Sequence, residues 1–271
     1  MFADWIYGNP TWMWAPVLIV AAAVVACMGL LVFNRVFPPR RRADSSDACA
    51  AVFGVTGTVY AVLIGFVAIA AWQAFSDGDK IVQEESSRIT NIYRDVAGLE
   101  PQDVELVRTL LHEYANHVVT VEWAAQMAGK AIDHGPGRQI LGRLHDATLS
   151  LDRGGRTAPL VQAEVLRELN ELYKARRARH IIAGPDSGVP SVFWFIIAIG
   201  TLLTIFASYQ LAVASVRLHL LLVSIVSTSI VLVIVIVIEH DKPFRGELGI
   251  SKEPFALAIS SMQHPGGRGQ K

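Results

Sequence analysis

The stretch of sequence with the densest set of reactive side chains is HEYANH, which spans His112–His117. Two histidines beside a glutamate can bind zinc and activate a water molecule when the histidines stand four residues apart on one helix. In this stretch they stand five residues apart, which separates them by about 140° around a helix. We therefore interpret the stretch as a solvated helix face and predict no metal site.

No other pattern in the chain predicts catalysis. The sequence has no phosphate-binding glycine loop, no dinucleotide fingerprint and no nucleophile elbow. Its other histidines are scattered, and its two cysteines, Cys27 and Cys49, lie in or beside apolar runs. We therefore predict that the protein is not an enzyme, with no catalytic residue and no cofactor.

The composition is unusual for a water-soluble protein. Only 18% of the 271 residues are charged, and the mean hydropathy is +0.38. The formal net charge is +0, so the chain has no excess of the basic residues that neutralise phosphates, and we expect no nucleic-acid partner. These values are typical of a membrane protein that also has a water-facing part.

Four apolar runs are long enough to cross a lipid bilayer. They are Trp14–Phe33, Val52–Trp72, Val192–Val213 and Leu218–Ile238. None contains Lys, Arg, Asp or Glu, and each is close to the roughly 20 residues that a helix needs to span the hydrocarbon layer. We predict transmembrane helices at about residues 14–34, 52–73, 191–213 and 218–238.

These runs divide the chain into parts. We expect an N-terminal transmembrane hairpin at 1–76, a helical extramembrane bundle at 77–186, a C-terminal transmembrane hairpin at 187–240, and a C-terminal segment at 241–271 with a disordered end. In the middle part, apolar residues recur at helical spacing, as at Val107, Leu110, Leu111 and Tyr114. Thr157 is a plausible cap for the last helix. The predicted fold class is an all-α membrane protein with four transmembrane helices and a bundle between helices 2 and 3.

The basic residues give two conflicting signals for orientation. Arg35 and Arg40–Arg42 follow the first run and would lie in the cytoplasm by the positive-inside rule. Lys174–Arg179, before the third run, and Lys242–Lys252, after the fourth, favour the opposite arrangement. Both sides of the membrane therefore remain open for the bundle.

The second apolar run has two distinct faces and continues, without a proline, into a charged amphipathic helix. One face is a stripe of small residues that would let another helix pack closely: Gly54, Gly57, Ala61 and Gly65. The face beside it carries Thr58, Val62 and Phe66. Hydroxyls on such helices can bond within their own helix or face a wet path, and we keep both interpretations. No span contains Asp, Glu, Lys or Arg, so we expect no proton relay.

Three stretches together carry a family resemblance. They are GFVAIAAWQAFSDGDKIVQEESSRITNIYR (Gly65–Arg94), LNELYKARRARH (Leu169–His180) and HDKPFRGELGISKEPF (His240–Phe255). With the four-span layout, they resemble the bestrophin-like proteins of the DUF4239 group over nearly the full chain. The second-helix stretch is also similar, over about 30 residues, to the corresponding helix of bestrophins proper.

The resemblance to bestrophins implies a pentameric anion channel whose second helix lines a narrow apolar neck. Thr58, Val62 and Phe66 would then face the path, where an apolar constriction can gate by dewetting. The resemblance also implies a cytoplasmic bundle. The chain lacks an obvious acidic calcium clasp, so calcium gating is not expected.

At the end of the fourth run, the family pattern implies a turn that docks onto the bundle. Its residues are Asp241, Pro243, Phe244 and Gly246. The alternative is a simple helix stop with charges at the membrane interface.

Two functions follow from these observations. The first is a homo-oligomeric channel for small anions, embedded as a multi-pass protein in the lipid bilayer of the bacterial inner (cytoplasmic) membrane. The second is a non-conducting membrane scaffold or sensor whose bundle binds a partner. Ion flux and oligomeric state would distinguish the two.

Overall fold

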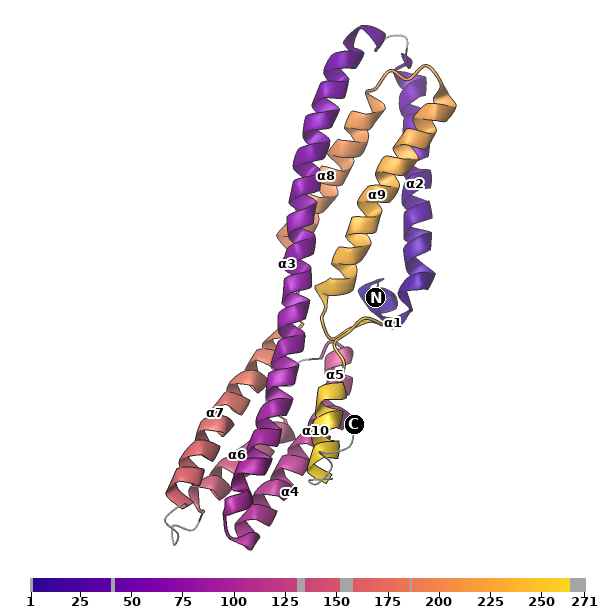
Figure 1. The fold of residues 1–271 in the computed structure, drawn as a ribbon. Coiled ribbons are helices and arrows are strands. Elements are labelled where there is room, and N and C mark those ends of the chain that lie inside the picture. The colour runs from indigo at the N-terminus through magenta and orange to yellow at the C-terminus, as the bar shows by residue number, and fades with distance from the viewer. Residues whose placement is uncertain (1, 40–41, 131–134, 152–157, 186, 264–271) are drawn as a thin grey trace, which may run out of the picture. The chain divides into compact units, whose positions relative to one another are not determined.

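The computed structural model describes residues 2–39, 42–130, 135–151, 158–185 and 187–263. The expected disordered end and the expected helix cap at Thr157 lie outside these residues. The described residues form helices and no strand, so the predicted all-α class is confirmed (Figure 1). The α-helices are α1 (Phe2–Gly8), α2 (Thr11–Val36), α3 (Ser46–Asp95), α4 (Pro101–His117), α5 (Trp123–Met127), α6 (Pro136–Leu149), α7 (Ala158–Ala183), α8 (Ser191–Tyr209), α9 (Val216–Asp241) and α10 (Glu253–Gln263).

Four of these helices, α2, α3, α8 and α9, are long and apolar enough to cross a membrane. They contain three of the four apolar runs in full, and the third run, Val192–Val213, as far as Tyr209. α3 is a single helix of 50 residues, because no proline or stop signal interrupts the sequence where its apolar half gives way to its charged half. The predicted continuity of the second helix is confirmed.

One helix end differs from the prediction. α8 ends at Tyr209, whereas the expected helix continued to about residue 213. The N–H groups of Gln210 and Leu211 bond to carbonyls three residues back, which tightens and ends the helix. α9 then begins at Val216, because the Ser215 hydroxyl accepts a hydrogen bond from the Leu218 N–H and caps it.

The described residues divide into two compact units. The membrane unit comprises the residues up to Ala74, Gly188–Lys242 and Gly246–Leu248. The bundle unit comprises Phe75–Ser187, Pro243–Arg245 and the residues from Gly249 through α10. The first part of α3 therefore belongs to the membrane unit and its second part to the bundle unit.

In the membrane unit, small apolar clusters join neighbouring helices. α2 lies along α9 (Figure 1), and Ala26, Leu30 and Val223 form one buried cluster between them. The hydroxyl of Tyr209 in α8 donates to the carbonyl oxygen of Ala26 at 2.6 Å. Cross-helix bonds of this kind satisfy polar groups that lipid cannot.

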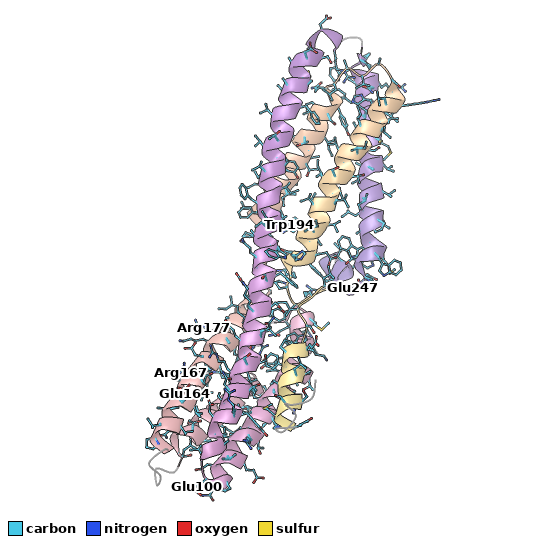
Figure 2. The ribbon with its side chains drawn as sticks, viewed as in Figure 1. Glu100, Glu164, Arg167, Arg177, Trp194 and Glu247 are labelled. Carbon is cyan, nitrogen blue, oxygen red and sulfur yellow. The ribbon has the colours of Figure 1, made fainter. Side chains whose placement is uncertain are left out.

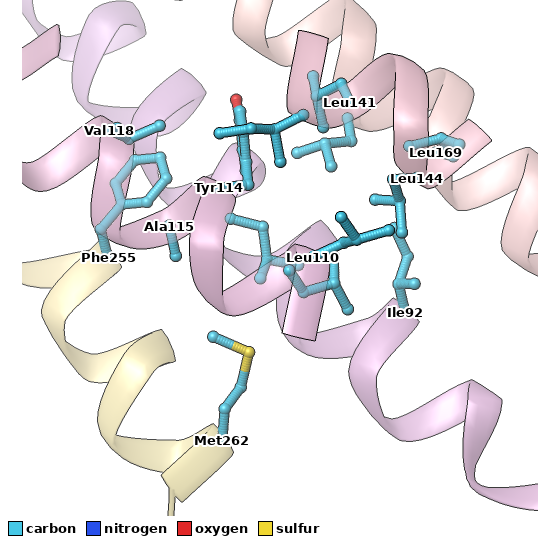
Figure 3. Close-up of a cluster of buried hydrophobic side chains, with 14 of the residues drawn as sticks. Ile92, Leu110, Tyr114, Ala115, Val118, Leu141, Leu144, Leu169, Phe255 and Met262 are labelled. Atoms are coloured by element: carbon cyan, nitrogen blue, oxygen red, sulfur yellow. The ribbon is translucent and has the colours of Figure 1, made fainter. Parts of the chain in front are cut away.

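In the bundle unit, one continuous apolar core joins the helices. Figure 3 shows part of it, where side chains from α3, α4, α6, α7 and α10 meet. The C-terminal helix α10 contributes Phe255 and Met262, which are 0% and 2% exposed. No helix was predicted at Glu253–Gln263, so the C-terminal segment has a structural role in the core that the sequence analysis missed.

Candidate functional site

The membrane part of α3 packs against α8 and α9 through one narrow face. Tyr60, Ile64, Val67 and Ala71 recur at intervals of three and four residues and are all buried, as one face of a helix requires. The Tyr60 hydroxyl donates to the carbonyl oxygen of Ile197 at 3.1 Å and lies 2.6 Å from the Thr201 hydroxyl. We call this the packed face of α3.

The packed face depends on a glycine in α8. A Cβ atom added at Gly200 would overlap the ring of Tyr60. Only a residue without a side chain lets the tyrosine ring lie directly on the α8 backbone, which is the role that small residues have in membrane helix contacts.

The residues predicted to line a path lie on the opposite side of α3. With 100° per residue, Thr58 and Val62 point about 150–170° away from the packed face, and Phe66 points about 130° away, on the side of Ala70. The Val62 side chain is 55% exposed and the Phe66 side chain is 68% exposed. The Thr58 hydroxyl donates to the Gly54 carbonyl at 2.8 Å, so this hydroxyl bonds within its own helix. We call this surface the outward face.

The stripe of small residues is also uncovered in the single chain. A Cβ atom added at Gly54, Gly57 or Gly65 would have no contact within 4 Å in the described part of the chain, and Ala61 is exposed. The stripe therefore packs against no helix of its own subunit that the structure describes. Its predicted role in helix packing stays a prediction.

The predicted docking turn has residues in both units, and its docking role stays a prediction. Asp241 belongs to the membrane unit, where its carboxylate accepts the Val189 N–H at 2.6 Å. Gly246, with φ of +86°, belongs to the same unit. Pro243 and Phe244 belong to the bundle unit, and Phe244 packs edge-on against Trp123 with ring centroids 5.5 Å apart.

The bundle unit contains a buried network of charged side chains. Glu85, Glu122 and Arg179 are 0% exposed. The Arg179 guanidinium donates to the Glu85 Oε2 at 2.6 Å and to the Glu122 Oε2 at 2.8 Å. Arg176 donates to the same Glu122 oxygen at 2.9 Å, and the Tyr114 hydroxyl donates to Glu85. One arginine thus joins two carboxylates from different segments of the chain.

Glu122 is at the centre of this buried ion network. It ends a π-helical turn, Val118–Glu122, a local widening of the helix that is frequent at functional sites. The Nε2 atoms of His180 and His117 lie 3.3 Å and 3.7 Å from its carboxylate oxygens. Burial alone would raise the pKa of Glu122, but the hydrogen bond from His180 and the charges of Arg179 and Arg176 lower it well below its usual range.

The network corrects the interpretation of His112–His117 as a fully solvated face. Glu113 is exposed, but Tyr114 is buried and its hydroxyl takes part in the network. Burial raises the pKa of Tyr114 well above its usual value, and the neighbouring Glu85 adds to the effect. In the described residues, no group of three or more His, Cys, Asp or Glu side chains is placed to hold a metal ion.

Sequence reasoning missed the network because its arginines look like surface residues. Arg176, Arg177 and Arg179 fall in one basic run near the end of α7, which suits the negative end of a helix dipole. Only packing separates them: Arg179 is buried and Arg177 is exposed. Figure 2 shows Arg177 with Glu164 and Arg167, side chains of α7 that reach solvent.

Comparisons with known proteins agree on one fold. A family model for the bestrophin-like domain matches residues 8–255. A mutant of a bacterial bestrophin homolog from Klebsiella pneumoniae superposes with a TM-score of 0.69 at 12% identity, covering 90% of this chain and 99% of that chain. Another structure of the Klebsiella pneumoniae homolog gives a TM-score of 0.67 at 13% identity, covering 93% and 97%. At this identity the structures show the fold alone. No curated protein sequence matches the chain significantly.

Proposed function

The chain belongs to the bestrophin-like family, and from this membership we propose that it is a homo-oligomeric membrane channel for small anions. In this proposal each copy contributes one α3, whose outward face, with Thr58, Val62 and Phe66, lines the path. The protein is an integral membrane protein with four candidate spans in its described residues. A location in the bacterial inner membrane is part of the proposal.

One observation carries the proposal. α3 is fixed to its own subunit through the packed face and leaves the opposite side uncovered, with Phe66 68% exposed. Lipid alone could cover Phe66, but the stripe of small residues beside it also lets a second helix approach α3 closely. In a ring of copies, the small-residue stripe can contact a neighbouring copy while the outward face surrounds the axis.

The side chains of the outward face would interact only weakly with a passing ion. Val62 and Phe66 are apolar, and the Thr58 hydroxyl is already bonded to its own helix. An ion in such a path meets no charged side chain that would hold it, and an apolar constriction can close by losing its water. The face therefore favours passage and gating over tight binding.

Ion flux through the purified protein tests the proposal. Proteoliposomes loaded with chloride should release it faster than liposomes that contain heat-denatured protein, and light scattering in detergent should show an oligomer. A monomer would contradict the proposal, because a single α3 encloses no path. An oligomer without flux would instead favour the non-conducting scaffold or sensor.

A further inference from the structure

The membrane unit contains a pocket beside α3 that its own chain leaves unfilled. Its volume is about 400 Å³. α3 contributes Leu63, Phe66, Ala70 and Ala74 to its wall, and α8 contributes Phe193 and Ile196. Phe66 therefore borders both the pocket and the outward face. The wall is almost wholly apolar, and the polar side chains that line it are those of His240 and Asp241.

The polar end of the pocket lies near the last turns of the membrane part of α3. α8 runs antiparallel to α3, since Ile197 and Thr201 contact Tyr60 while the residues that precede α8 line the pocket together with Ala74. The Asp241 carboxylate accepts the N–H of Val189, just before α8, at 2.6 Å. Asp241 is therefore at the level of Ala70–Ala74 in α3.

The pocket and the small-residue stripe lie on opposite flanks of α3. With 100° per residue, Ala70 in the pocket wall points about 100° to one side of the packed face. Trp72 points about 100° to the other side, in line with Ala61 and Gly65 of the stripe. Its side chain is 55% exposed. One flank thus presents a cavity, and the other presents a large aromatic side chain at the same level along the helix.

A closed ring brings these two flanks together. Neighbours in a ring meet through two different surfaces of the same chain, and copies related by an axis along the membrane normal lie at one depth. If α3 surrounds the axis, Trp72 of one copy faces the pocket flank of the next at matching depth. This step rests on the proposed function.

We propose that Trp72 of each copy inserts into the pocket of the neighbouring copy and completes it. The indole combines an apolar ring with one N–H donor. The ring matches the wall at Leu63, Ala70 and Phe193, and the N–H matches the carboxylate of Asp241 at the polar end. The carboxylate already accepts the Val189 N–H at 2.6 Å and the Tyr7 hydroxyl at 3.4 Å, and its remaining lone pairs can accept the indole N–H as well. The contact closes the ring of α3 helices beside the path.

Disulfide cross-linking tests the contact. Trp72→Cys and Phe193→Cys are combined in a chain whose native Cys27 and Cys49 are changed to Ser. Oxidation should join at least half of the chains into dimers and larger ladders. The matched control pairs Trp72→Cys with Phe195→Cys, another exposed phenylalanine of α8, and should remain uncross-linked.

The outcomes distinguish a failure of the Trp72 contact from a failure of the channel proposal. An intact, conducting oligomer without the Trp72–Phe193 cross-link overturns the contact and leaves the channel. A monomer overturns both.

Native mass spectrometry provides a second test of the contact. Trp72→Ala should raise the monomer fraction at least tenfold. The control Trp12→Ala removes an indole that is 72% exposed and should leave the monomer fraction unchanged. The same spectra also detect bound lipid. If the wild-type ring retains one lipid per chain and Phe193→Trp displaces it, the pocket holds a lipid and the Trp72 contact is overturned.

Discussion

The bundle unit and the membrane unit differ in how completely one chain covers its apolar side chains. In the bundle unit, core residues such as Ile92, Leu111 and Leu144 are 0% exposed. In the most apolar part of each candidate span, at most 33% of the residues are buried. The bundle unit therefore closes its core alone, whereas the membrane unit relies on lipid and, in our proposal, on other copies.

This difference separates stability from function. The bundle unit places charges inside its core, where each must keep its partner because an unpaired buried charge is costly. The outward face of α3 makes no contact that one chain needs. Substitutions in the bundle unit should therefore change the free energy of unfolding, and substitutions on the outward face should change conduction alone.

The largest loss of stability should follow removal of Arg179. Arg179→Leu leaves Glu85 and Glu122 without their shared cation and should lower the stability of the bundle unit by about 3–5 kcal/mol. The matched control, Arg177→Leu, changes an exposed arginine two residues away and should stay within about 0.5 kcal/mol. Hydrogen exchange of bundle peptides, followed by mass spectrometry, measures both. Equal effects of the two variants would show that the network does not hold the bundle together.

A smaller loss should follow from filling the close contact between Gly200 in α8 and Tyr60 in α3. Gly200→Ala would push its new methyl group into the ring of Tyr60 and should cost about 1–3 kcal/mol. Gly142→Ala has nothing within 4 Å of the added atom and should be neutral or stabilise α6 by up to about 1 kcal/mol. Thermal unfolding in detergent compares them. An unchanged unfolding temperature for Gly200→Ala would mean that α3 and α8 can move apart at this contact without loss of stability.

Acid should weaken the bundle unit through Glu122. The pKa of Glu122 is lowered in the folded chain, so its stabilisation is complete above the unfolded value of about 4.5 and is lost as the pH falls towards the folded value. The slope for one proton is at most about 1.4 kcal/mol per pH unit. Hydrogen exchange between pH 5 and 3 should therefore show the stability gap between the wild type and Glu122→Gln narrowing. A difference in stability that stays constant over this pH range would contradict the lowered pKa of Glu122.

The sequence predicted the membrane unit's helices better than the contents of the bundle core. Apolar runs and the absence of proline were enough for the four spans and for the long α3, because length and hydropathy decide those features. The helix Glu253–Gln263 was missed, since its burial depends on Phe255 finding a core made by distant segments. Arg177 and Arg179 show the same limit: identical residues in one run differ only in what packs against them.

The smallest change in stability, with a clear change in function, is expected at Phe66. Phe66→Ala removes a side chain that is 68% exposed in the single chain, so the free energy of unfolding should change by less than about 0.5 kcal/mol. If Phe66 narrows the path, its loss should widen the constriction and raise chloride flux severalfold. Phe195→Ala, on α8 with 66% exposure, is the matched control and should leave flux unchanged. Unaltered flux in both variants would remove Phe66 from the path. Increased flux in both variants would mean that the loss of any exposed phenylalanine raises the flux. The outward face of α3 would then have no special role in conduction.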